Sequence, residues 1–152
     1  MKNSILIILV IFYQILFLSK IFAKEIEFDA SDIEIVDNQN LTIANNGIAK
    51  IKEDGIVIEG VKIKYFKDQS LIVVSQGKIS KIDINLKISS DTIEYNLKNG
   101  KINFIDKVRI DDKMNNLVIY SDRISYEINN QKIFGERNTT IIDEFNNIYE
   151  VS

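Results

Sequence analysis

Three tyrosines at regular intervals are the side chains in this sequence whose type and spacing most suggest a chemical role. Tyr65, Tyr95 and Tyr126 stand 30 and 31 residues apart, each at the end of a similar segment. A phenolic hydroxyl can hydrogen-bond to the polar head of a ligand. Tyrosines at matching places in neighbouring strands are also typical of an aromatic ladder that only stabilises a sheet, and the sequence favours this structural role.

The side chains that most enzymes use are missing. The 152 residues include no Cys and no His, which removes thiolate nucleophiles and the commonest metal ligands. Adjacent acids such as Asp111 and Asp112 could bind a cation, but acidic pairs in turns are usually only solvated. The 19 basic and 22 acidic residues are interleaved without a basic stripe, which argues against a nucleic-acid partner. We therefore expect a protein without catalysis, cofactor or metal.

The three tyrosines belong to an internal repeat. Segment 85–95 (NLKISSDTIEY) is matched by segments 55–65 (GIVIEGVKIKY) and 116–126 (NLVIYSDRISY), and a diverged copy lies at 25–35 (EIEFDASDIEI). Four copies spaced by about 30 residues indicate an architecture in which each unit buries its apolar face against its neighbours.

Each copy reads as a strand. Apolar residues alternate with polar ones, as at Ile56 and Ile58, which is typical of a strand that buries one face. Asn, Asp and Gly clusters predict tight turns between strands. These clusters lie at residues 37–38, 45–47, 54–55, 99–100, 115–116 and 129–130. The pattern predicts one all-β domain over residues 24–152, built from bent antiparallel hairpins that form two facing sheets.

The alternation changes register once in every copy, always at a small residue. In the copy at 55–65, the apolar residues Ile56 and Ile58 occupy even-numbered positions, whereas Ile63 and Tyr65 occupy odd-numbered positions after a shift of one residue. Such a shift marks a bend or bulge where a strand leaves one sheet for another. The predicted strand corners are Ala30, Gly60, Ser90 and Ser121.

Apolar side chains on both sides of these corners should point between the two sheets. Alternating Ile and Tyr in a sandwich are usually plain core. Sheets that stay open along one edge would instead form a slot for acyl chains, where each buried CH₂ contributes about 0.8 kcal/mol. The residues predicted to line this slot are Phe28, Ile33, Ile35, Ile58, Ile63, Tyr65, Ile88, Ile93, Tyr95, Ile119, Ile124 and Tyr126.

The N-terminus has the pattern of an export signal. Lys2 precedes an apolar run over residues 5–18, and Ala23 stands before a charged sequence. We expect residues 1–23 to form a signal helix that is cleaved before Lys24. The alternative is an uncleaved membrane anchor, although the run is short for a bilayer span of about 20 residues. Both alternatives place residues 24–152 in an exported compartment.

The repeat resembles a known family in two kinds of segment. SDTIEY (90–95) and SDRISY (121–126) are followed by a turn and a return strand with a glycine element, as at Gly47-Ile48 and Gly77-Lys78-Ile79. This arrangement is similar to the OstA-like domain of the lipopolysaccharide-transport proteins LptA, LptC and LptD, over about residues 24–152. The opening FDASDIEI (28–35) most resembles the N-terminal domain of LptD.

The resemblance implies a V-shaped, twisted β-jellyroll in the periplasm, near the inner or outer membrane. Its apolar groove would hold the acyl chains of lipopolysaccharide, and its edge strands would join other jellyrolls head to tail. Residues 146–152 match residues 115–121 and predict such an edge strand. The alternative is that this last strand simply closes the domain and joins no other chain. The alternatives to a bridge are a membrane-anchored LptC-like adaptor and a structural β-repeat or adhesion module.

Overall fold

The computed structural model describes residues 24–81 and 86–151, which form a single antiparallel sheet of ten strands. Seven long strands follow one another: β1 (Ile26–Val36), β2 (Leu41–Ile51), β3 (Ile56–Phe66), β4 (Leu71–Lys81), β5 (Leu86–Asn96), β6 (Lys101–Asp112) and β7 (Leu117–Glu127). Three short strands end the chain: β8 (Lys132–Arg137), β9 (Thr139–Ile142) and β10 (Ile148–Val151). Each long strand pairs with the next, β7 also pairs with β8 and β9, and β10 pairs with β9. The prediction of an antiparallel all-β domain is confirmed.

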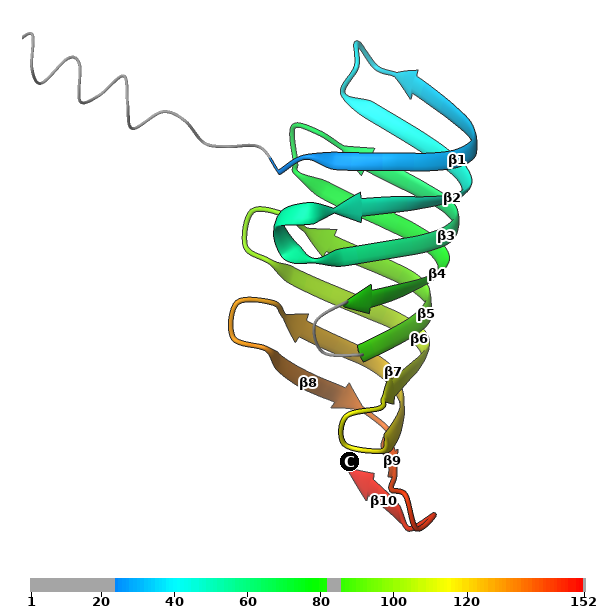
Figure 1. Ribbon diagram of the computed structural model, residues 1–152, viewed down its shortest axis with the longest axis vertical. Coiled ribbons are helices and arrows are strands. Elements are labelled where there is room, and N and C mark those ends of the chain that lie inside the picture. The colour runs from blue at the N-terminus through cyan, green and yellow to red at the C-terminus, as the bar shows by residue number, and fades with distance from the viewer. Residues whose placement is uncertain (1–23, 82–85, 152) are drawn as a thin grey trace, which may run out of the picture.

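The arrangement differs from the predicted two facing sheets, because hydrogen bonds connect all ten strands into one sheet. Figure 1 shows how one sheet forms two layers: the long strands curve back at one edge, so that the sheet folds along a line crossing them. The predicted signal helix lies outside the described residues. Within the described part of the chain, no helix is long and apolar enough to cross a membrane.

The fold line coincides with a gap in the strand pairing. The residues left out of every strand pairing there are Ser31, Asn46, Val61, Gln76, Asp91, Asp106, Lys107 and Asp122. The pairing of β5 with β6 also leaves out Ser90 and Val108. The predicted corner residues Ala30, Gly60, Ser90 and Ser121 each stand immediately before a skipped residue. Strands β2, β4 and β6 bend there through a residue with left-handed backbone conformation, with φ of 47° at Asn46, 48° at Gln76 and 51° at Lys107.

The prediction of a hairpin turn at residues 45–47 was wrong, since these residues lie inside β2 at the fold line. A corner and a tight turn both need a residue that tolerates positive φ, so an Asn-Gly pair marks either one. The predicted turn at residues 99–100 is confirmed, and its Gly100 has a φ of 68°.

The fold line divides the sheet into two arms. The first arm contains residues 26–30, 47–51, 56–60, 77–81, 86–90, 108–112 and 117–121, with β9 and β10. The second arm contains residues 32–36, 41–45, 62–66, 71–75, 92–96, 101–105 and 123–127, with β8. Buried side chains of both arms, such as Ile58 and Ile63, form one core cluster. The folded sheet therefore has an inner, apolar face shared by its arms.

Candidate functional site

The structure arranges all twelve predicted lining residues in three rows across the sheet. Directly paired residues of neighbouring antiparallel strands point to the same face, so each row can be followed through the strand register. Row 1 runs Ile33–Ala44–Ile63–Val74–Ile93–Phe104–Ile124–Gly135. Row 2 runs Ile35–Thr42–Tyr65–Ile72–Tyr95–Ile102–Tyr126–Ile133. Row 3, on the first arm, runs Phe28–Ala49–Ile58–Ile79–Ile88–Ile110–Ile119–Ile141–Tyr149.

The three rows are closed in the middle of the sheet and open at its β1 edge. Ile63 and Ile93 of row 1 are completely buried, whereas Ile33 at the start of the same row is 45% exposed. In row 2, Tyr95 is completely buried and Ile35 is 61% exposed. The side chains at the β1 edge therefore present an inward-facing apolar surface to solvent.

The opposite end of the sheet is open as well. Row 3 passes from the half-buried Ile119 and Ile141 to Tyr149 on β10, which is 52% exposed. Row 2 ends at Ile133 on β8, with 37% exposure. Apolar rows that reach both ends of a sheet could continue into another chain that pairs with the end strands.

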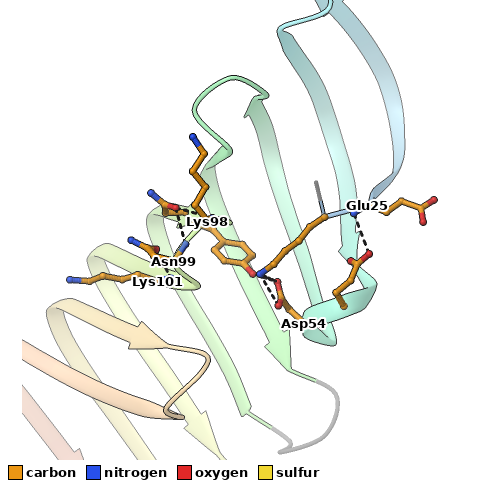
Figure 2. Close-up of polar contacts among 9 residues, drawn as sticks. Glu25, Asp54, Lys98, Asn99 and Lys101 are labelled. Carbon is orange, nitrogen blue, oxygen red and sulfur yellow. Dashed lines mark hydrogen bonds and ion pairs between the residues drawn. The ribbon is translucent and has the colours of Figure 1, made fainter. Parts of the chain in front are cut away.

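A polar cluster, which we call the polar clasp, connects the two arms at their free ends. The Lys24 ammonium lies 2.8 and 2.9 Å from the two carboxylate oxygens of Asp54, and the Tyr95 hydroxyl donates a hydrogen bond to the same carboxylate. The Lys24 ammonium also lies 5.9 Å from the centre of the Tyr95 ring. Figure 2 shows the Asp54 side chain at the centre of this group, and a neighbouring bond from the Glu25 amide to Glu53.

The elements that position the clasp come from both arms. Lys24 lies two residues before the start of β1, and Asp54 lies in the short 3-10 turn η1 (Lys52–Asp54) between β2 and β3. Tyr95 belongs to β5 in the second arm. Burial raises the pKa of the Tyr95 hydroxyl, and the bond to Asp54 raises this pKa further. The hydroxyl therefore stays protonated and remains a hydrogen-bond donor at neutral pH.

Sequence reasoning missed this cluster. Asp54 was assigned to a turn, which is correct, and Lys24 only to a cleavage site. A sequence signal for the contact is hard to find, because the three residues come from separate hairpins and meet only when the arms fold together. The structural role that the sequence favoured for the tyrosines, an aromatic ladder between neighbouring strands, does not match the register, because Ile72 and Ile102 separate the three tyrosines in row 2.

Tyr126 occupies the position two strands further along row 2 but has a different environment. Its side chain is 3% exposed, and its hydroxyl has no hydrogen-bond partner among residues 24–81 and 86–151. A buried hydroxyl without a partner destabilises the folded state, because the hydroxyl loses its hydrogen bonds to water.

The same substitution should consequently have opposite effects at the two tyrosines. Tyr95→Phe removes a bond to a carboxylate and should lower the free energy of unfolding by about 1–3 kcal/mol. Tyr126→Phe removes a hydroxyl without a partner and should raise the free energy of unfolding by about 1 kcal/mol. Urea unfolding at pH 7 measures both changes. An unchanged free energy of unfolding in Tyr95→Phe would show that the bond from Tyr95 to Asp54 contributes nothing to stability.

The outer face of the sheet, which points away from the three rows, carries charged and polar pairs. Arg109 contacts Asp111 at 2.7 Å and the Tyr120 hydroxyl at 2.8 Å, and this guanidinium lowers the pKa of Asp111. In residues 24–81 and 86–151, no three acidic side chains are grouped so that they could hold a metal ion. A surface hollow of about 480 Å³ lies outside the fold line, with Asn46, Val61 and Gln76 in its lining.

Comparisons with known proteins agree with this geometry. The crystal structure of LptH, described as the LptA-homologous periplasmic component of the lipopolysaccharide transport device from Pseudomonas aeruginosa, matches with a TM-score of 0.66. The match covers 85% of this chain and 95% of LptH at 13% sequence identity, which shows a shared fold. No curated protein sequence matches the chain.

The family comparison goes further than the fold. The family model described as lipopolysaccharide-assembly, LptC-related, matches residues 4–149. The particular likeness to LptD, expected from residues 28–35, finds no support in these comparisons. The match spans nearly the whole chain, so the chain belongs to the LptC-related family of lipopolysaccharide-assembly proteins, whose role is transport and not catalysis.

Proposed function

We propose that the three inner rows hold the acyl chains of lipopolysaccharide while it crosses the periplasm. The observation that carries this proposal is the continuity of the rows, which join the β1 edge to β8 and β10 almost entirely through apolar side chains. Acyl chains gain about 0.8 kcal/mol for each CH₂ that leaves water. A continuous apolar surface would let a chain move along the sheet without re-entering water at each strand.

The path would follow the inside of the V-shaped jellyroll that the folded sheet resembles. Lipid would first contact the exposed ends of rows 1 and 2, at Ile33 and Ile35. In the middle strands, side chains such as Ile93 and Phe104 already fill the space between the arms. Acyl chains would therefore have to separate the arms there, and movement would depend on a partner that delivers lipid.

The two ends of the sheet would make the contacts with other jellyroll proteins. At one end β1 is an edge strand, and at the other end β10 is an edge strand with Ile148, Tyr149 and Val151 all more than half exposed. Edge strands with unpaired backbone groups pair readily with another chain. Two different ends give a head-to-tail contact, which can extend into a bridge.

Photo-crosslinking tests the lipid path. A photoreactive amino acid at Ile33 should crosslink lipopolysaccharide in cells, because this side chain is exposed on the inner face. The matched control is Val61, which is 50% exposed but lies at the outer hollow of the fold line. Lipopolysaccharide that crosslinks equally at both positions, or only at Val61, would contradict the path.

A second role, as a membrane-anchored LptC-like adaptor, is favoured by one observation. The family match begins at residue 4 and so includes the apolar run over residues 5–18. In this role residues 1–23 would remain attached and hold the sheet at the inner membrane. N-terminal sequencing of the exported protein separates the alternatives: a mature chain that starts at Lys24 excludes the anchor.

A further inference from the structure

We propose that the polar clasp of Lys24, Asp54 and Tyr95 is a gate across the open side of the folded sheet, which acyl chains must open to enter between the arms. This inference rests on the proposed lipid path and adds a step to it. The clasp differs from the rest of the interface between the arms, because charged and polar groups replace apolar contacts there.

The strand register places the clasp opposite the fold line. Tyr95 stands four residues beyond the skipped residue Asp91, and it belongs to row 2, the row of the second arm farther from the fold line. Asp54 lies beyond Ile51, at the end of the first arm that is farthest from the skipped residue Asn46. A bond between these two side chains therefore joins the free ends of the arms, where the inner face would otherwise open.

The contacts suit a closure that can be reversed. The Asp54 side chain is only 11% exposed and holds both an ammonium and a hydroxyl. Charge-assisted hydrogen bonds are stronger than neutral ones, which favours the closed form. When the arms separate, water can hydrate Lys24 and Asp54, so opening does not leave these charges buried without partners.

The gate covers only part of the sheet. Lys24, η1 and β5 place it over the strands β1 to β5. Two strands further along row 2, the Tyr126 hydroxyl has no hydrogen-bond partner in the described part of the chain. An acyl chain that enters at Ile33 would meet the clasp before it reaches Tyr126. The clasp would thus control passage from the open β1 edge into the middle of the sheet.

A gate that must open before binding lowers the observed affinity by the fraction of molecules in the open form. Weakening the clasp should therefore speed the association of lipid. We expect Tyr95→Phe to bind fluorescently labelled lipopolysaccharide about threefold to tenfold faster in stopped-flow mixing, since a tenfold change corresponds to about 1.4 kcal/mol. The control is Tyr120→Phe, which also removes a hydroxyl bond but on the outer face, and which should bind at the wild-type rate.

A crosslink provides the converse test. Because the chain contains no cysteine, the pair Asp54→Cys and Tyr95→Cys can be joined by a short bismaleimide whose spacer contains a disulfide. The crosslinked protein should take up labelled lipopolysaccharide at least tenfold more slowly, and reduction of the spacer should restore the rate. Recovery after reduction would exclude misfolding as the cause of the slow uptake.

The outcomes separate the gate from the path. Equal uptake by the crosslinked and reduced proteins, with wild-type binding intact and Ile33 crosslinking to lipid, would overturn the gate and leave the lipid path standing. An unchanged rate in Tyr95→Phe would also overturn the gate. Failure of the wild-type protein to bind lipopolysaccharide would overturn both proposals.

Discussion

Replacing Ile93 by alanine is expected to lower the free energy of unfolding by about 2–5 kcal/mol, as large-to-small substitutions in closed cores do. Ile93 is completely buried in row 1, between Val74 on β4 and Phe104 on β6. The surrounding strands are fixed by hydrogen bonds on both sides, so they cannot collapse fully into the space left behind. Small domains have a total stability of about 5–15 kcal/mol, so this loss would be a large fraction.

Ile33 provides the matched comparison, because it is the same residue type in the same row. It is 45% exposed and has a strand on one side only, where it pairs with Ala44. Ile33→Ala should therefore cost about 1 kcal/mol or less in the monomer. Urea unfolding followed by circular dichroism measures both losses. Similar losses for the two variants would show that row 1 is no more closed in the middle than at its edge.

The difference in stability loss between Ile93→Ala and Ile33→Ala should also depend on self-association. If the β1 edge of one copy pairs with strands β8 and β10 at the opposite end of a second copy, Ile33 becomes covered and the cost of Ile33→Ala rises with protein concentration. The cost of Ile93→Ala should stay constant, because this side chain is already buried within one chain. Repeating the unfolding experiment at several protein concentrations distinguishes an isolated domain from one that joins head to tail.

The rows follow from a sequence pattern whose cause is local. A period of two, shifted by one residue at a small side chain, decides which side chains point inward. The 30-residue repeat spans two strands, so it brings these side chains to the same height in every second strand. Ile33, Ile63, Ile93 and Ile124 consequently fall in one row. The repeat pattern could not predict how the exposed fraction changes along the row, since the exposure of each side chain depends on how many strands flank it.

Features that depend on contacts between distant segments escaped prediction. The clasp needs Lys24 and Asp54 to meet Tyr95 across the folded sheet, and a repeat pattern contains no information about such a contact. One sheet forms in place of the two expected sheets because each long strand continues through the bend. The strand pairing is interrupted for only one or a few residues at the fold line and then resumes. Alternation alone cannot distinguish a bent strand from two separate strands.

The tight fold line at Gly60 leads to a second stability prediction, in which two harmful substitutions partly compensate. A Cβ added at Gly60 would overlap the Cγ1 atom of Val74, while the next nearest atoms lie 3.5 and 3.6 Å away. Gly60→Ala should therefore cost about 1–3 kcal/mol through overpacking. Val74→Ala removes a completely buried side chain and should cost about 2 kcal/mol.

In the double variant, the methyl group introduced by Gly60→Ala would occupy space that Val74 vacates. The combined loss should be smaller than the sum of the single losses by about 1–2 kcal/mol, which a double-mutant cycle of urea unfolding measures. Gly47→Ala is the control, because its Cβ would meet backbone atoms, Ala30 Cα and the Asp29 carbonyl oxygen, each at 2.8 Å. Truncating Val74 gives this backbone no room, so Gly47→Ala and Val74→Ala should add. Additive losses at Gly60 would mean that Val74 does not set how closely the strands pack at the fold line, and that the small residue there serves the backbone bend alone.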